Sequence, residues 1–280
     1  MRAFRFGVTH AGPPDMASWT ATAKRVESLG YDTFLVPDTL DTAAPLPALG
    51  AVAAVTSRLR VGTWVLCDPL RNPRSVAWEI GSLARMTGGR VELGLGAGRP
   101  AAGEDARRLG LPFGAPAERV TRLRESVQLI RGLLDGAEPD FPGAGYRVPI
   151  LIAASGPRLL EFAAQAADII AFGWPPDTDE NRARSVIDPV VTAAGDRAGE
   201  IELAAGLIAV GDEQHPWLRR LGVDPLALAA AGAVTVVAGS PREIADTLLR
   251  RRDRLGLSYV TVPSASAEAF APVVELLAAG

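Results

Sequence analysis

The stretch Arg90–Arg99, RVELGLGAGR, decides between two folds. It begins with apolar residues typical of a buried strand and ends in alternating glycines, Gly94, Gly96 and Gly98. Glycine adopts positive φ and lets another group approach the backbone closely, so such a strand end can present main-chain N–H groups to a ligand. One interpretation is a Rossmann-type dinucleotide fingerprint. The other is one strand of a parallel barrel that holds a ligand at its carboxyl end.

The order of the predicted elements favours the barrel. Eight apolar runs of strand length alternate with helical segments, at 4–9, 31–36, 59–66, 91–95, 148–153, 168–172, 201–210 and 258–262. Three strand–helix units precede Arg90–Arg99, and no clear helix opens directly at its glycines, which weakens the Rossmann interpretation. We therefore expect residues 1–280 to form a single (β/α)8 TIM barrel domain, with its active site at the carboxyl ends of the strands.

Composition and charge exclude several function classes. The formal net charge of −3 argues against nucleic acid as the main partner. A single cysteine, Cys67, rules out an internal disulfide. The chain starts with MRAFRFGV, which is typical of a strand rather than a signal peptide, and no apolar run reaches the length of a membrane helix. We expect a cytoplasmic protein.

The scarcity of certain side chains limits the chemistry. Lys24 is the single lysine and lies in an amphipathic helical pattern, which argues against a Schiff-base enzyme. His10, His215 and Cys67 are too few for a histidine–cysteine zinc site, and no carboxylate spacing suggests a metal. We therefore expect a bound cofactor and a small-molecule substrate, with no metal.

Residues that follow the first three strands are candidate site residues. His10 ends the first strand and is a candidate catalytic residue, or a hydrogen-bonded loop histidine. Asp38 ends the second strand and is a candidate catalytic residue, or a helix cap. Trp64 and Val65 lie in the third strand, where the indole either supports a flat ring or belongs to the core.

The later strand ends carry two glycine-containing loops. We expect both to bind a cofactor, the first through an arginine suited to an anion and the second through N–H groups at a helix start. They comprise Gly96, Ala97, Gly98 and Arg99, and then Ala153, Ala154, Ser155 and Gly156. Trp174, after the sixth strand, is suited to a substrate or ring edge. The run Arg250–Arg254 is predicted to be a solvated helix face.

These pieces, in their order and spacing, resemble the luciferase-like flavin and deazaflavin oxidoreductases, and most closely the branch that uses coenzyme F420. The resemblance extends over nearly the whole chain. It is carried by YDTFLVPDTL, LRVGTWVLCDPLRNP, MTGGRVELGLGAG, ERVTRLRESVQLIRGLLDG, VPILIAASGP and VAGSPREIADTLLRRRDRLGLSYVTV.

The resemblance implies a cofactor whose ring lies in the barrel mouth and whose phosphate end lies near the fourth and fifth strands. It implies a cis peptide between Trp64 and Val65 that supports the ring. It matches the family's phosphate loop to Ala153–Gly156 and its fourth-strand loop to Gly96–Arg99. The expected cofactor is coenzyme F420, with FMN as the alternative, and relatives suggest a homodimer.

One position departs from the family pattern. Many F420 enzymes carry an acidic residue and then histidine after the second strand, whereas this chain has Asp38 and Thr39. Thr39 is a poor acid, so a proton must come from His10, the substrate or another residue. We expect Thr39 and Trp174 in the substrate pocket, and a compact loop after the fourth strand that leaves the mouth open.

The expected activity is hydride transfer between F420 and a small organic substrate. One alternative is an FMN-dependent luciferase-like monooxygenase. The other is an inactive barrel that serves as a binding or structural subunit.

Overall fold

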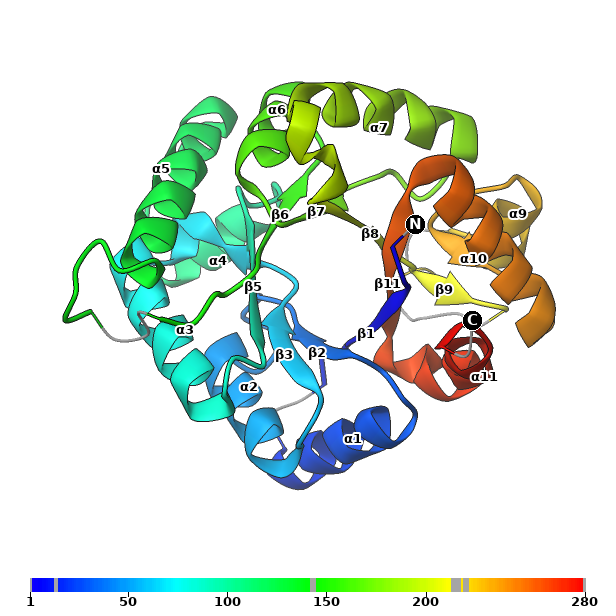
Figure 1. Cartoon of the computed structure of the whole chain (residues 1–280), viewed down its shortest axis with the longest axis horizontal. Helices are drawn as coiled ribbons and strands as arrows, with labels where there is room; N and C mark the ends of the chain where they lie inside the picture. Colours follow the sequence, from blue (N-terminus) through cyan, green and yellow to red (C-terminus); the bar gives the residue numbers. More distant parts are fainter. Residues whose placement is uncertain (1, 13–14, 142–144, 213–217, 219–221, 279–280) are drawn as a thin grey trace.

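Parallel strands form a closed barrel that is surrounded by helices (Figure 1). The computed structural model describes residues 2–12, 15–141, 145–212, 218 and 222–278. The wall runs in the order β3-β2-β1-β11-β8-β7-β6-β5-β4, and β3 also pairs with β5, which closes the ring. β3 and β4 are two halves of one interrupted strand, so the nine strands make eight positions in the barrel wall. We call each of these eight positions a stave. The predicted TIM barrel is confirmed.

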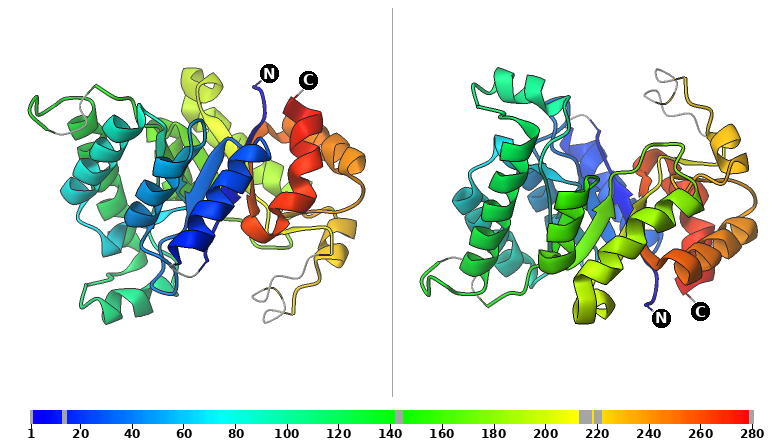
Figure 2. Two further views of the ribbon diagram at one scale, coloured as in Figure 1. Left: turned by 90° about the horizontal axis from the view of Figure 1, so that it is seen from below. Right: turned by 90° about the horizontal axis from the view of Figure 1, so that it is seen from above.

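The helices lie around the outside of the strands, as the two side views in Figure 2 show. The wall consists of β1 (Arg5–Thr9), β2 (Thr33–Val36), β3 (Arg60–Thr63), β4 (Leu66–Cys67), β5 (Val91–Gly96), β6 (Ile150–Ala154), β7 (Ile169–Phe172), β8 (Glu202–Gly206) and β11 (Leu257–Pro263). The helices are α1 (Met16–Ser28), α2 (Pro45–Val55), α3 (Pro73–Thr87), α4 (Ala102–Arg108), α5 (Pro116–Leu134), α6 (Pro157–Ala166), α7 (Glu180–Ala194), α9 (Pro225–Ala230), α10 (Pro241–Leu255) and α11 (Ala267–Ala278). Short 3₁₀ turns are η1 (Asp68–Leu70), η2 (Gly195–Gly199) and η3 (Ser264–Ser266).

The structure differs from the prediction in two segments, and a third lies partly outside the described residues. The predicted strand 201–210 is split, because β9 (Ala209–Val210) leaves the barrel and pairs with β10 (Val236–Val237). The loop after β5 contains the unpredicted helix α4. The helical stretch expected between Val210 and Gly232 lies partly outside the described residues, as does His215. Among the described residues, none of the helices combines the length and apolar character that a bilayer crossing requires.

Side chains alternate between the two faces of the barrel wall, as strand geometry requires. The outward set packs under the helices in one large core. The inward set is a separate cluster of Leu35, Leu151, Ile169, Ala171, Ala204 and Tyr259, with Trp64, Val65 and Ala153 packed against it. This inward cluster fills the bore in the way that side-chain layers fill TIM barrels.

The amino end of the bore is closed by charged residues. The Arg5 guanidinium lies 3.1 Å from carboxylate oxygens of both Glu92 and Glu202. It also lies 4.1 Å from the centre of the Tyr259 ring, and the Tyr259 hydroxyl donates a 2.5 Å hydrogen bond to Glu92. Burial, together with the neighbouring Glu92 charge, raises the pKa of Tyr259 well above its usual value. We call Arg5, Glu92, Glu202 and Tyr259 the amino-end layer.

One prediction about a helix face is wrong at one residue. Arg251 was expected on a solvated face, but it is 5% exposed and donates to the carbonyls of Ala233 (2.8 Å) and Val236 (3.1 Å). The β9–β10 pairing places main-chain carbonyls against α10, and the several N–H donors of the Arg251 guanidinium satisfy them.

Candidate functional site

The third stave is interrupted by a bulge at Trp64 and Val65. The peptide between these residues is cis, as predicted. The Trp64 N–H donates to the Val36 carbonyl on β2 (2.8 Å), whereas the Thr63 hydroxyl accepts from the Gly94 N–H (2.9 Å) and donates to the Gly94 carbonyl (2.8 Å). The bulge is therefore fastened to both neighbouring staves.

The glycines of β5 make room for this bulge. A Cβ built on Gly94 would fall on the Thr63 carbonyl oxygen and lie 2.8 Å from Val65 Cγ1. A Cβ on Gly96 would lie 2.9 Å from Val65 Cγ2. The alternating glycines thus have a packing role that the sequence interpretation, which assigned them to a ligand, did not include.

The Trp64 side chain crosses the bore. Its Cζ2 atom would lie 3.2 Å from a Cβ on Gly206, and β8, which carries Gly206, is four staves away in either direction. The indole stands edge-on to the Tyr259 ring, with 6.3 Å between centroids and 76° between planes. Trp64 therefore lies between the amino-end layer and the carboxyl end of the barrel.

Small, uncharged residues line the bore near its carboxyl end. A Cβ built on Gly96 would lie 3.7 Å from Ala153 Cβ, and a Cβ built on Gly206 would lie 3.5 Å from Thr261 Oγ1. Ala171 belongs to the same inward cluster. We call these five residues the small-residue mouth. Gly206 and Thr261 were missed from sequence, although both lie two residues after inward-facing ones, Ala204 and Tyr259 respectively, so the alternation of β8 and β11 could have found them.

The loop from β6 into α6 is open to solvent. Ser155 and Gly156 are exposed, and a Cβ on Gly156 would meet nothing within 4 Å. Gly156 is the N-cap of α6 and supplies no capping side chain, and Pro157 follows at the first helical position. The Arg158 side chain is exposed, and its guanidinium has no hydrogen-bond or ion-pair partner among the described residues. N–H groups at an uncapped helix start, beside a cation, form a site suited to an anion.

The loop after β5 is held by Arg119 of α5. This buried guanidinium donates to the carbonyls of Ala97 (3.0 Å) and Gly114 (2.8 Å) and lies 4.2 Å from the centre of the Phe113 ring. The Arg99 side chain, by contrast, is exposed, and its guanidinium makes no hydrogen bond or ion pair within the described part of the chain. It is a cation available to an anionic ligand.

Asp38 is occupied by contacts within the chain. It is 9% exposed, accepts a hydrogen bond from the Cys67 N–H (3.0 Å), and forms a two-pronged ion pair with Arg71, whose Nε lies 3.0 Å away. These contacts fasten the segment that follows the bulge. Burial and the Asp38 charge raise the pKa of the Cys67 thiol to about 11. Thr39 is half-buried, and its hydroxyl has no hydrogen-bond partner among the described residues.

His10 and Trp174 face the helices rather than the bore. The His10 ring stands 4.6 Å from that of Trp19 on α1, and its Nδ1 lies 2.8 Å from Ser264 Oγ. Burial lowers the pKa of His10, so the ring is neutral at pH 7. Trp174 stacks on Phe172 at 4.8 Å within the outer core. The structure does not bring these two residues to the small-residue mouth, and their site roles stay predictions.

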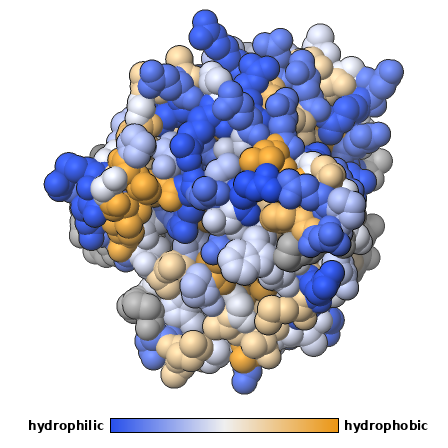
Figure 3. Space-filling model, turned by 90° about the vertical axis from the view of Figure 1, so that its left-hand side faces the viewer, coloured by the Kyte–Doolittle hydropathy of each residue, from blue (hydrophilic) through white to orange (hydrophobic). Residues whose placement is uncertain are grey.

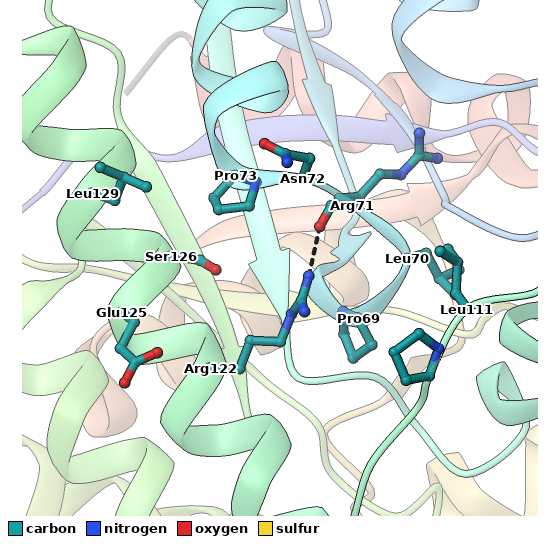
Figure 4. A pocket seen from close by; sticks show the side chains of 11 residues that line it. Pro69, Leu70, Arg71, Asn72, Pro73, Leu111, Arg122, Glu125, Ser126 and Leu129 are labelled. Carbon is teal, nitrogen blue, oxygen red and sulfur yellow. Dashed lines mark hydrogen bonds between the residues drawn. The ribbon is translucent and has the colours of Figure 1, made fainter.

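A groove of about 500 Å³ lies outside the barrel wall, between η1, the start of α3 and α5 (Figure 4). Its lining consists of Pro69, Leu70, Arg71, Asn72, Pro73, Leu111, Pro112, Arg122, Glu125, Ser126 and Leu129. Both arginines are already engaged, Arg71 by Asp38 and Arg122 by Asp68. On this side of the molecule, over α3, α4 and α5, hydrophobic side chains lie in small groups among hydrophilic ones (Figure 3). The groove contains none of the predicted site residues.

Comparison with known proteins assigns the family. A model of the luciferase-like monooxygenases matches residues 2–221. The chain belongs to the luciferase-like monooxygenase family. Among its curated relatives, an F420-dependent glucose-6-phosphate dehydrogenase of Nakamurella multipartita is 33% identical over 68% of this chain and 62% of its own. A 5,10-methylenetetrahydromethanopterin reductase of Methanolobus tindarius is 29% identical over 71% of this chain and 63% of its own.

This luciferase-like chain spans less than two thirds of the length of those two relatives. Solved structures share its fold over almost the whole chain. One is an F420-dependent secondary alcohol dehydrogenase in complex with an F420–acetone adduct, with a TM-score of 0.77 and 16% identity over 99% of this chain and 98% of that one. At that identity the likeness concerns the fold.

Proposed function

We propose that this luciferase-like protein is a coenzyme F420-dependent oxidoreductase that transfers a hydride between the deazaflavin ring and a small organic substrate with a carbonyl or unsaturated bond. The observation that carries the proposal is the open start of α6, which lies at the carboxyl end of the barrel beside Ala153 of the small-residue mouth. The names of the F420-dependent relatives support the choice of cofactor.

The residues present fit such a cofactor. Ser155, Gly156 and the first-turn N–H groups of α6 would hold its phosphate, with Arg158 and Arg99 as available cations. Positions 96, 153, 171 and 206 carry only glycine and alanine, so no large side chain projects from them into the mouth above Trp64, where a flat ring system would lie. When bound, the deazaflavin donates or accepts the hydride, and the protein positions it against the substrate.

The source of the proton is part of the proposal. Both oxygens of Asp38 are engaged by Arg71 and the Cys67 N–H, so it acts through positioning the bulge. Thr39 can orient a substrate oxygen by hydrogen bonding. We propose that the substrate or solvent supplies the proton, with His10 as the alternative once its ring turns from α1 toward the mouth.

Titration of the purified protein with F420 and with FMN tests this function. We expect F420 to bind at least tenfold more tightly than FMN, with F420 binding monitored through its fluorescence. Tighter binding of FMN would favour the luciferase-like monooxygenase alternative. Binding of neither at tens of micromolar would overturn both enzyme functions and favour the inactive barrel. With F420 bound, glucose 6-phosphate and 2-propanol are the first hydride donors to assay, by loss of deazaflavin absorbance.

We also propose that the protein is a homodimer. Two large apolar side chains on α3 support this, since Trp78 is 57% and Met86 83% exposed. Light scattering coupled to size-exclusion chromatography measures the mass directly, and a value near 29.3 kDa would contradict the proposal.

A further inference from the structure

The indole of Trp64 divides the bore into two parts of different chemistry. The amino-end layer below it carries the charges of Arg5, Glu92 and Glu202. Near the carboxyl end, the small-residue mouth consists of glycine, alanine and threonine, with the apolar Val65 beside Gly96. The indole reaches from the third stave to the opposite wall, so it closes the passage between the two parts.

We propose that the contact between Trp64 and Gly206 sets the depth of the mouth and therefore the size of the ligand that the barrel accepts. Trp64 is the floor of the site, and Gly206 is the specificity-determining position on the opposite stave. This inference deepens the proposed function and depends on it only for the identity of the ligand.

The floor is held in place from below. The Tyr259 ring, against which the indole stands edge-on, is fully buried, and its hydroxyl is hydrogen-bonded to Glu92. The Arg5 guanidinium covers the ring and is itself paired with Glu92 and Glu202. Because an aromatic ring pinned at its hydroxyl and its face cannot sink into the bore, the indole cannot move toward the amino end.

The opposite wall is equally restrictive. With 3.2 Å between Trp64 Cζ2 and a Cβ on Gly206, even alanine at position 206 requires the indole to shift. Tyr259 blocks movement downward, so the shift is directed into the mouth and makes it shallower. Loss of the indole would do the reverse, and would extend the mouth down to Tyr259 as an apolar shaft.

The first experiment removes the floor and restores it with a free ligand. We expect folded W64G to bind one equivalent of indole in calorimetry, with a rise in melting temperature in saturating indole. The wild type and the matched control W78G, which loses an exposed tryptophan from α3, should show neither effect. A folded W64G that binds no indole would overturn the proposal.

A milder pair of variants decides the matter if W64G does not fold. G206A should alter the tryptophan emission spectrum of the wild type but not that of the W64F protein, since the added methyl group acts on this one indole. G199A is the control, because a Cβ there would meet nothing within 4 Å. Equal changes in both backgrounds, or none in either, would overturn the proposal. Neither experiment uses F420, so a failure of the proposed function is distinguishable from a failure of this inference.

Discussion

Neighbouring strands β5 and β6 both have glycines toward their carboxyl ends, within the strand in β5 and in the loop that follows β6, and the two sites differ in what occupies the space beside the glycines. At Gly94 and Gly96 that space is filled by the Thr63 carbonyl and the Val65 side chain. At Gly156 it is empty. A glycine at a strand end thus indicates close approach by some group, and only the folded chain shows whether that group belongs to the protein or must come from a ligand.

The largest effect that separates the two glycine sites is expected from alanine at Gly94 in β5. The added Cβ falls on a backbone carbonyl that cannot turn aside, so overpacking should cost 3 kcal/mol or more, at or above the upper end of the usual range of about 1–3 kcal/mol. Urea denaturation measures the loss. The matched control is G156A, for which we expect a change within about 0.5 kcal/mol. Similar stability of the two variants would remove the distinction between the two glycine sites.

A second large effect concerns Asp38. Its carboxylate holds the segment that follows the Trp64–Val65 bulge, beside β5. D38A leaves Arg71 and the Cys67 N–H without their acceptor, which should cost about 2–3 kcal/mol of unfolding free energy. D41A is the control, since the Asp41 side chain is 90% exposed. If D38A abolished turnover while keeping wild-type stability, Asp38 would be catalytic rather than positional.

A third effect tests the open loop and should leave stability unchanged. G156D places a carboxylate where we propose that a phosphate binds, and the space there accepts it without a clash. We expect F420 affinity to fall at least tenfold, or about 1.4 kcal/mol. The nearly isosteric, uncharged G156N should retain most of the affinity. Equal F420 affinity of G156D and the wild type, by fluorescence titration, would refute the assignment of the phosphate site.

The smallest effect concerns the amino end of β6. This end is held by hydrogen bonds, whereas the loop after the carboxyl end of β6 is open to solvent. Burial favours protonation of Asp168, but hydrogen bonds from the Ile150 N–H and Arg131 outweigh it and hold the Asp168 pKa below its usual value. A depressed pKa adds stability above the unfolded-state value of 3.8, and that stability is lost as the pH falls below it.

D168N should therefore lower the unfolding free energy by about 1 kcal/mol at pH 7, and the difference should shrink at pH 3. Denaturation at several pH values checks this, with the exposed Asp246 replaced by asparagine as the control. A difference that did not depend on pH would show that the Asp168 charge is not what fastens the strand.

Much of the architecture could be predicted because it rests on local patterns. Apolar runs separated by amphipathic helices marked all eight staves, and Pro157 after Ser155 and Gly156 marked the start of α6. The bulge at Trp64 and Val65 was predicted through the family resemblance. The split of β8 and β9 was missed because a continuous apolar run does not show where a strand leaves the wall.

The sequence pattern did not show which way two candidate site residues face. His10 and Trp174 were selected because they follow strands, and both do lie at the carboxyl end of the barrel wall. Side chains alternate across the wall, however, so a residue at the right height can still face the helices, as these two do. Gly206 and Thr261 have the inward register and were overlooked because neither carries a reactive group.

The sequence by itself determined the barrel, the order of its staves and the helix start that is proposed to bind phosphate, because periodicity and turn residues act over a few neighbouring positions. Only the tertiary structure decided that Trp64 meets Gly206 across the bore and that Arg251 is buried against β10. The physical reason is that the strands close into a barrel. When eight staves form a ring, residues far apart in the chain face each other, and the space between them decides what each side chain can do.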